Sequence, residues 1–460
     1  MDSFAFSEYY FLNGNKLFSP GNLNLQSIDG RCASEFPIVY YIASLTYSIF
    51  GLNFVSLKII TLLLLFFGFL FCIKTILLLS NELLTSFILG SLFFSSTVIL
   101  YYGSLYLPDV HAFSLCLISF YFFISYTKTL KGSDLIFLYL FITLATLLKA
   151  SFYYYNCVFF LLLVFLSKSL NVKINKNVIY FILSTVIIAA WYFFVRKYNE
   201  LNFAYYYTTK PRPFWEYSHD KILQTFYSIS VYWYSKYYFQ STFHFFYSAV
   251  LIYIFFIKKL KLELWLILLL AVFSGIYFCL FLIQFIDHDY YFIALIPSII
   301  AIVSVSFVNI RKRFKNKILD YSLTVFILIL TLLSLNYAKL NLHRRYTNNL
   351  DSYSIVRYQL NKAEDFLDAM KIAESSKFLV IGDRSQNGSL VLLNRFGWTY
   401  ANFHTDSSSI KSNLSMADYL VVLKPSENRV PQDILDGLKN CDRFSYNSNY
   451  IFSLKNYRNQ

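Results

Sequence analysis

The chain has 460 residues, of which 57% are hydrophobic and only 14% are charged. A soluble protein of this length would form about three domains, but so few polar side chains could not cover its surface, so a water-soluble globular protein is excluded. The net charge is +14, and 25 of the 40 basic residues but only 14 of the 26 acidic ones precede residue 344. We attribute this excess to cytoplasmic loops of a membrane protein rather than to nucleic-acid binding.

Residues 2–34 are polar and turn-rich. The apolar run 36–50 is shorter than the roughly 20 residues that a spanning helix needs, and we interpret it as an interfacial helix that ends at Gly51. The stretches that follow predict about ten membrane-spanning helices. They are expected over residues 53–79, 83–104, 110–127, 134–150, 152–167, 177–196, 242–258, 263–286, 289–309 and 318–338.

Basic residues gather in four of the connecting loops. These are Lys128 with Lys131; Lys168 with Lys173 and Lys176; Lys258 with Lys259 and Lys261; and the sequence RKRFKNK at 311–317. With the spans above, all four loops fall on one side, which the positive-inside rule makes cytoplasmic. Residues 2–35, the aromatic-rich loop 198–240 and the chain after 342 then lie outside. We therefore predict a multi-pass protein of the cell (inner) membrane with an exoplasmic or periplasmic C-terminal domain.

The chain changes character near His343. Residues 376–383 and 416–425 are predicted buried strands, and residues 358–375 and 431–440 have helical spacing. This alternation predicts a small α/β domain over 343–460, after an all-α polytopic membrane domain over 1–342. The sequence IGDRSQNGS carries too few glycines for a dinucleotide-binding loop.

Charged groups beside spans cost free energy, so those on the outer side are functional candidates. They are Asp2, Glu8, Arg31, Glu35, Asp109, His111, Lys149, Asp287, His288 and Asp289. Two carboxylates could act on an acceptor hydroxyl, and a lysine could hold a phosphate. Aromatic rings suit a sugar, although those of 198–240 also fit an interfacial belt. For Asp109 the competing interpretation is a first-turn helix position, and for Asp287 and Asp289 we expect a solvated loop.

Five short motifs follow one another between residues 2 and 297. They are Asp2 in MDSFAFSEYYFLNGNKLFSP, Glu35 in SEFPIVYYIASLTYSIFG, Pro108-Asp109, Lys149-Ala150, and HDYYFIALIP from His288 to Pro297. Their order is similar to the signatures of GT-C-fold glycosyltransferases that use polyprenyl-phosphate sugars. The chain therefore resembles the protein O-mannosyltransferase and aminoarabinose transferase group, which is family 39-like.

The resemblance implies inverting transfer of a sugar from a polyprenyl phosphate to a glycan, lipid or protein acceptor on the outer face. It implies Asp2 as the catalytic base, with Asp109 and Glu35 orienting the acceptor or binding a cation. Lys149 would hold the lipid phosphate, and Arg31 and His288 are weaker candidates for it. The carboxylates could also hold a divalent metal, although no spacing demands one.

Family members have a transmembrane helix before the first-loop Asp. We therefore expect that the N-terminus is truncated or that its start is misassigned, which puts the activity of this chain in question. A polysaccharide-precursor flippase or exporter is the main alternative, and a non-catalytic membrane scaffold with a carbohydrate-binding tail is the third. An exporter needs charge along a path through the membrane, whereas an enzyme of this kind needs it at one face.

Overall fold

The computed structural model describes residues 2–167, 174–205, 211–256, 262–313, 317–347, 352–403, 407–424 and 430–457. The chain forms two compact units. Unit 1 comprises Met1–Leu57, Phe194–Thr208 and Thr347–Gln460, and unit 2 comprises Lys58–Phe193 and Thr209–Tyr346. The predicted boundary between 342 and 343 concerns membrane and soluble parts and stays a prediction. The basic-loop residues outside the described residues are Lys168, Lys173, Lys258, Lys259, Lys261 and Lys315.

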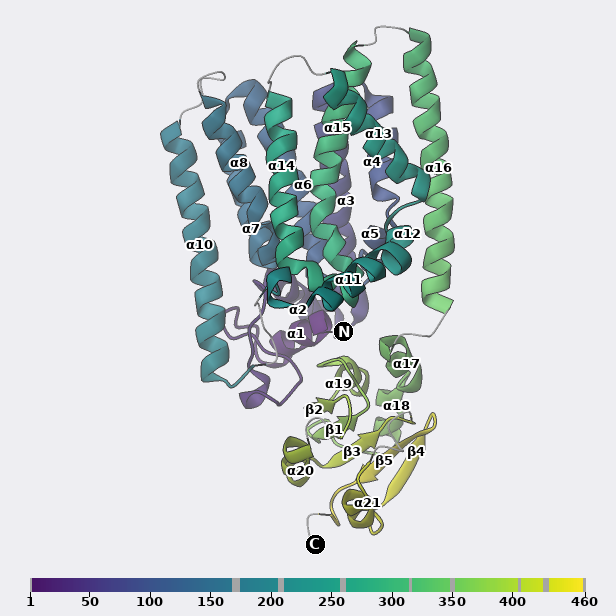
Figure 1. Cartoon of the computed structure of the whole chain (residues 1–460). Coiled ribbons are helices and arrows are strands. Elements are labelled where there is room, and N and C mark those ends of the chain that lie inside the picture. The colour runs from purple at the N-terminus through teal and green to yellow at the C-terminus, as the bar shows by residue number, and fades with distance from the viewer. Residues whose placement is uncertain are drawn as a thin grey trace. The chain divides into compact units, whose positions relative to one another are not determined.

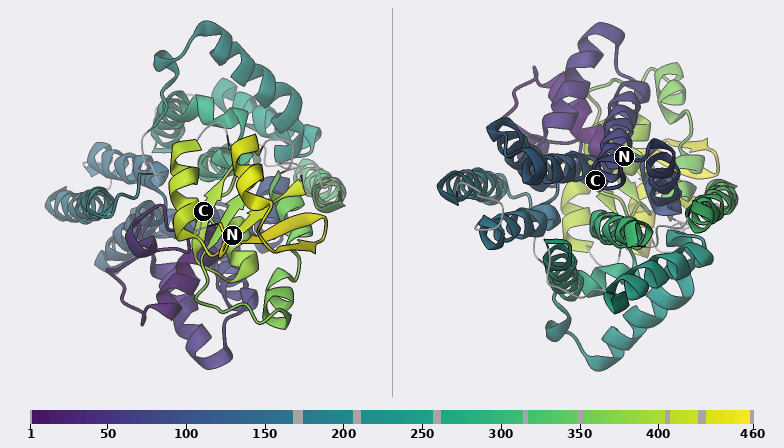
Figure 2. Two further views of the ribbon diagram at one scale, coloured as in Figure 1. Left: turned by 90° about the horizontal axis from the view of Figure 1, so that it is seen from below. Right: turned by 90° about the horizontal axis from the view of Figure 1, so that it is seen from above.

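Unit 2 is a bundle of helices that run side by side (Figure 1) and that are seen along their axes in Figure 2. Within the described residues, six helices are long and apolar enough to span a membrane, or seven if a pair bent by 96° counts as one span. The helices are α3 (Phe54–Ser80), α4 (Leu83–Phe94), α5 (Thr97–Tyr102), α6 (Pro108–Thr129), α7 (Gly132–Leu148), η2 (Ala150–Phe152), α8 (Tyr153–Phe165), α10 (Ile174–Leu201), η3 (Phe214–Glu216), α11 (His219–Ser228), η4 (Ile229–Trp233), α12 (Tyr234–Tyr237), α13 (Gln240–Phe256), α14 (Leu262–Phe281), η5 (Leu282–Ile286), η6 (Asp289–Leu295), α15 (Ile296–Arg313) and α16 (Lys317–Thr347).

Every predicted span contains a helix, but in four of the ten no single helix reaches 18 residues. The span predicted over 83–104 is interrupted at Ser95 and Ser96, between α4 and α5. The helices α7 and α8 are apolar but shorter than 18 residues, and α13 is the second half of the bent pair. The region 198–240, which we expected to be a loop, contains α11, η4 and α12, so that expectation was wrong there.

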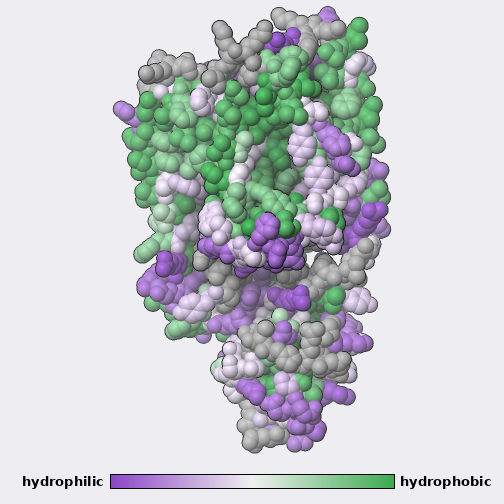
Figure 3. Space-filling view, viewed as in Figure 1, coloured by the Kyte–Doolittle hydropathy of each residue, from purple (hydrophilic) through white to green (hydrophobic). Residues whose placement is uncertain are grey.

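The helices of unit 2 differ in how much of their surface is covered. Most of α6 and α15 is buried, whereas less than a third of the apolar window of α3, α10 and α16 is buried. Figure 3 shows hydrophobic residues over the outward face of the bundle. An apolar outer surface around a covered core is what lipid as a solvent requires, since each helix satisfies its own backbone hydrogen bonds. The protein is therefore a multi-pass membrane protein.

Unit 1 is built on a five-stranded sheet with the order β2-β1-β3-β5-β4. The first three strands are mutually parallel, and β5 pairs antiparallel with both β3 and β4. Around it lie helices from both ends of the chain. The elements are α1 (Asp2–Leu12), η1 (Ile28–Gly30), α2 (Ile38–Phe50), α17 (Ser352–Gln359), α18 (Ala363–Ala369), β1 (Phe378–Ile381), α19 (Gly388–Leu393), β2 (Gly397–Tyr400), α20 (Ser407–Met416), β3 (Tyr419–Val422), α21 (Gln432–Leu438), β4 (Arg443–Tyr446) and β5 (Asn449–Ser453).

The C-terminal α/β arrangement was predicted, and the structure adds detail to it. The buried runs FLVI and YLVV form β1 and β3, and their side chains make the core with those of α20 and α21. The single helix expected over 358–375 is two helices, because the backbone turns at Lys362, whose φ is 59°. Near the N-terminus, α2 ends at Gly51 as expected, but residues 2–12 of the supposedly turn-rich segment are helical.

Candidate active site

In unit 2, Asp109 and Lys149 form an ion pair at the ends of two helices. Asp109 follows Pro108 in the first turn of α6, as the cap interpretation expected, and Lys149 is the residue at which α7 ends. The ammonium Nζ lies 3.0 Å from Asp109 Oδ2, and the Asp109 side chain is 1% exposed against 25% for Lys149. The motif residues Pro108-Asp109 and Lys149-Ala150, which are 40 positions apart, are therefore brought together.

Two tyrosines complete the surroundings of Lys149. Its Nζ lies 5.5 Å from the ring centroid of Tyr290 and 5.4 Å from that of Tyr291, both on η6. The faces of aromatic rings attract a cation at such distances. Both rings belong to the HDYY motif. Three of the five sequence motifs thus meet around a single ammonium group.

Asp289, which precedes the two tyrosines in the same motif, makes a second ion pair. It is 2% exposed, bonds to the Arg345 guanidinium, and accepts a hydrogen bond of 2.7 Å from the Tyr102 hydroxyl. The guanidinium carbon of Arg345 lies 4.2 Å from the ring centroid of Tyr101. The expectation of a solvated loop was therefore wrong for Asp289, because Arg345 at the end of α16 reaches it, while Asp287 is exposed.

His288 stands beside these groups with its ring 5.1 Å from that of Tyr290. Burial lowers the pKa of His288; Lys149 and Arg212 act in the same direction, and Asp287 and Asp289 oppose them. The imidazole is therefore uncharged at neutral pH, which makes it a hydrogen-bonding group rather than a cation. Sequence reasoning singled out His288 but missed Arg212, Arg345 and Tyr102, since none of them lies in a motif.

In unit 1, the Tyr40 phenol contacts the candidate Glu35 and also Ser3, the neighbour of the candidate Asp2. The Tyr40 hydroxyl and the Ser34 hydroxyl both donate to the Glu35 carboxylate. Ser3 Oγ, beside Asp2, lies 3.4 Å from the same Tyr40 hydroxyl. Burial, with Glu35 and Asp2 adding to it, raises the pKa of Tyr40 well above its usual range, so the phenol stays protonated and donates.

The remaining candidate of unit 1, Arg31, is solvent-exposed and pairs loosely with Asp29 at 3.8 Å. Asp2 receives a hydrogen bond of 3.1 Å from Asn387 Nδ2, a residue that the sequence did not mark. Asp2, Glu35 and Arg31 belong to unit 1, and Asp109, Lys149 and His288 to unit 2. That Asp2 and Asp109 share one cavity stays a prediction.

Neither set of residues forms a metal-ligand cluster. Within the described residues, no three His, Cys, Asp or Glu side chains come together as a cation site. A divalent metal at the carboxylates stays a prediction.

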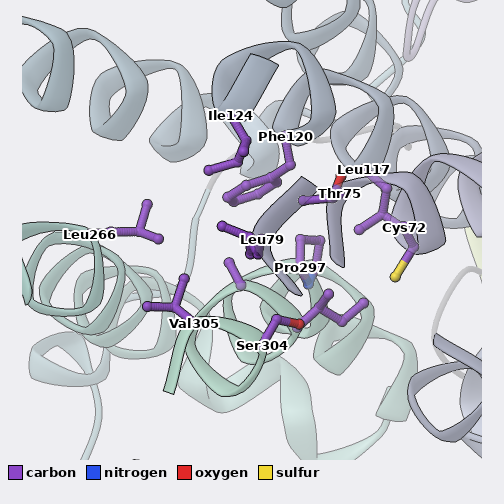
Figure 4. A pocket seen from close by; sticks show the side chains of 12 residues that line it. Cys72, Thr75, Leu79, Leu117, Phe120, Ile124, Leu266, Pro297, Ser304 and Val305 are labelled. Atoms are coloured by element: carbon purple, nitrogen blue, oxygen red, sulfur yellow. The ribbon is translucent and has the colours of Figure 1, made fainter. Parts of the chain in front are cut away.

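Unit 2 also contains an apolar hollow between α3, α6, α14 and α15 (Figure 4). The hydroxyls of Thr75 and Ser304 and the thiol of Cys72 are its most polar side-chain groups. No charged side chain lines it, so it is suited to a hydrocarbon and not to the chemistry of the charged groups.

The fold is shared with solved membrane transferases. No protein-family model matches the chain, and no curated protein matches its sequence. The apo structure of ArnT from Cupriavidus metallidurans matches with a TM-score of 0.59 and 10% identity over 100% of this chain and 94% of ArnT. ArnT bound to undecaprenyl phosphate matches with a TM-score of 0.54 and 11% identity, over 98% and 92% of the two chains.

The archaeal oligosaccharyltransferase AglB from Archaeoglobus fulgidus, in complex with an inhibitory peptide and a dolichol-phosphate, matches with a TM-score of 0.50 and 12% identity. The match covers 98% of this chain and 69% of AglB. At such identities the likeness concerns the fold. The chain therefore has the GT-C fold of these membrane transferases, as its sequence motifs predicted.

Proposed function

We propose that this protein is a membrane glycosyltransferase that moves a sugar from a polyprenyl-phosphate donor to a glycan, lipid or protein acceptor at the exoplasmic face of the cell (inner) membrane. The likeness to ArnT along the whole chain carries the proposal, since one of the ArnT structures holds undecaprenyl phosphate.

In this proposal Asp2 is the general base that takes the proton of the acceptor hydroxyl. Its carboxylate is half-buried at the start of α1, where a substrate can reach it. Glu35 orients the acceptor, with its own orientation fixed by the Tyr40 and Ser34 hydroxyls. A carboxylate base of this kind contributes roughly 10²–10⁴-fold to a rate.

Lys149 holds the phosphate of the donor and stabilises the polyprenyl phosphate as it leaves. Its pairing with Asp109 at 3.0 Å gives Asp109 a further role, which is to aim the ammonium group. His288, uncharged at neutral pH, can donate one N–H to a phosphate oxygen. Arg31 is the weaker phosphate candidate because it is exposed and belongs to the other set of residues.

The position of charge separates an enzyme from an exporter. The Asp109–Lys149 and Asp289–Arg345 pairs are at helix ends, and not along the middle of the apolar helices. This favours chemistry at one membrane face over a polar path through the bilayer.

The test is transfer of radiolabelled sugar from a polyprenyl-phosphate donor in membranes that contain the full-length protein, with an Asp2→Asn variant as the matched control. We expect label in a product fraction that depends on Asp2. Movement of labelled lipid across the bilayer without any transfer would contradict the proposal and support an exporter.

A further inference from the structure

A segment near the N-terminus lies along the edge strand β2 of the unit 1 sheet. Leu25 N donates to Gly397 O at 2.6 Å, and Gly397 N donates to Leu23 O at 3.1 Å. The indole Nε1 of Trp398 donates to Leu25 O at 3.0 Å. Residue 397 must be glycine here, since a Cβ would lie 1.8 Å from Phe378 O. Residues 23–25 therefore extend the sheet by backbone pairing, which fixes their position along the strand.

The side chain of Asn24 extends this attachment to the loop 382–388, which follows β1. Asn24 is fully buried, and its Nδ2 donates to Gln386 O at 2.7 Å and lies 3.1 Å from Thr399 Oγ1. A buried amide with several partners holds one geometry, because any displacement leaves polar groups unsatisfied. The N-terminal segment and the loop 382–388 are thus fixed to each other.

The loop itself is held by the buried carboxylate of Asp383. This side chain accepts the backbone N–H of Ser385, the hydroxyl of Ser385 and the backbone N–H of Ser389, each at 2.8 Å. The carboxylate is 2% exposed. Three short bonds to one ionisable group give the loop a single conformation on a rigid strand end.

Asn387 is the residue that this loop presents to α1. It is fully buried, and its Nδ2 donates to Asp2 Oδ1 at 3.1 Å. A donor on one carboxylate oxygen restricts the rotamer of the side chain, and so fixes where a general base presents its other oxygen. The amide is neutral, so it does this without the competing charge that an arginine or lysine would bring.

We propose that Asn387 is a positioning residue that holds the Asp2 carboxylate in orientation for the acceptor hydroxyl. The C-terminal α/β fold thereby contributes a side chain to the active site and completes it. This inference rests on the proposed function, since it assigns a role relative to Asp2 as the base.

The first experiment measures sugar transfer by the full-length protein with Asn387→Ala. We expect kcat to fall about ten- to hundredfold, which is the size of one hydrogen bond to a charged group, with little change in KM for the donor. The matched control is Asn413→Ala. Asn413 lies in the same fold, and its Nδ2 donates to the Tyr400 hydroxyl at 2.6 Å. Equal losses in the two variants would mean general destabilisation and would overturn the proposal.

The second experiment compares Asn387→Ala in the wild-type and in the Asp2→Ala background. A residue that acts through Asp2 has no further effect on the residual transfer once Asp2 is gone, whereas a structural residue costs the same factor in both backgrounds. If Asn387→Ala does not fold, Asn387→Asp replaces it, because it keeps the shape and sets a like charge against Asp2. The inference would also be overturned if the Asn387→Asp variant transferred sugar as fast as the wild type.

The outcomes separate the two proposals. If Asp2→Ala abolishes transfer while Asn387→Ala is silent, the positioning role is wrong and the glycosyltransferase proposal stands. If the wild type transfers no sugar, or if Asp2→Ala keeps the full rate, the proposed function itself fails and the inference fails with it.

Discussion

The ion pair of Asp109 and Lys149 shows what a single buried contact does for both stability and binding. The carboxylate is nearly inaccessible and the ammonium is one quarter exposed, so each partner depends on the other for compensation of its charge. In the proposed function, a phosphate that binds Lys149 joins an existing ion pair. The ion pair thus fixes the position of the ammonium group at the end of α7.

Lys149→Ala should weaken donor binding, because the phosphate loses its cation. We expect the donor KM to rise about ten- to hundredfold, with a loss of about 2–4 kcal/mol in stability as Asp109 is left buried without its partner. The double variant Asp109→Asn/Lys149→Ala should recover stability but not donor binding. The control is Lys197→Ala, whose exposed pair with Glu200 at 3.2 Å should contribute less than about 1 kcal/mol.

Asp2→Asn should abolish transfer while the protein stays folded. The amide cannot take a proton, so kcat should fall about 10²–10⁴-fold, yet the carbonyl oxygen of the new side chain can still accept from Asn387. Thermal unfolding tests whether the variant stays folded, and sugar transfer by the same preparation tests whether activity is lost. Full transfer by Asp2→Asn would rule out Asp2 as the base.

Glu8 on α1 predicts a pH dependence of stability. Its carboxylate is 1% exposed and neither of its oxygens has a hydrogen-bond partner within the described residues. Burial, with Glu364 adding to it, raises the pKa of Glu8 from 4.5 to about 8. Between these two values the native state keeps a proton that the unfolded chain releases. The stability contribution is therefore full below 4.5 and falls by at most about 1.4 kcal/mol per pH unit as the pH rises.

Glu8→Gln should remove this dependence. The melting temperature of the variant minus that of the wild type should increase steadily from pH 5 to pH 8. Glu374→Gln, which changes an exposed carboxylate in the same unit, should leave the difference flat. A flat profile for Glu8→Gln as well would show that Glu8 ionises freely in the native state.

At the scale of elements, hydrophobic length was the reliable signal and local breaks were not. The long apolar runs predicted helices where α3, α6, α10, α14, α15 and α16 lie, although α15 begins seven residues later and α16 ends nine residues later than expected. The break between α4 and α5 falls at Ser95 and Ser96, which a hydropathy window averages away. The hydroxyl of Ser95 pairs with that of Ser334 at 2.7 Å, a contact across 239 positions that no local pattern contains.

The basic run 311–317 contributes to the stability of the fold as well as to the predicted topology. The Arg311 guanidinium is 7% exposed, lies 2.7 Å from Glu82 and bonds to Asp320 and Thr85. It thus joins the start of α4, the end of α15 and the start of α16. Arg311→Gln should lower stability by about 1–3 kcal/mol in thermal unfolding, whereas Lys317→Gln, an exposed residue of the same run, should be neutral. Equal effects would mean that only the net charge of the run matters.

For the whole molecule, the side on which each loop lies is the sharpest test of the sequence interpretation. A cysteine placed at Glu216 should react with a membrane-impermeant reagent in intact cells, and one placed at Lys317 only after permeabilisation. The six native cysteines are buried or half-buried, which keeps the background low. Labelling at 317 from outside would invert the predicted topology.

The sequence predicted the membrane class, the GT-C fold and the C-terminal α/β arrangement, because these follow from hydrophobic length and alternation and from the order of the motifs. It also marked Asp109, Lys149 and His288, which the structure brings together. It could not predict the partners that orient them. Arg345, Tyr102 and Asn387 lie in no motif, and their roles depend on contacts between segments that are distant in the chain.

The bond between Asp2 and Asn387 has a consequence for biosynthesis. The two residues are 385 positions apart, and Asn24 meets Gln386 across 362. A ribosome finishes the described membrane helices before it makes the loop 382–388, so α1 lacks the hydrogen bond from Asn387 until that loop has been synthesised. A chain stopped at residue 380 would therefore insert normally and yet leave the carboxylate at position 2 unheld. Assembly in this order means that the hydrogen bond from Asn387 to Asp2 is among the last contacts of unit 1 to form.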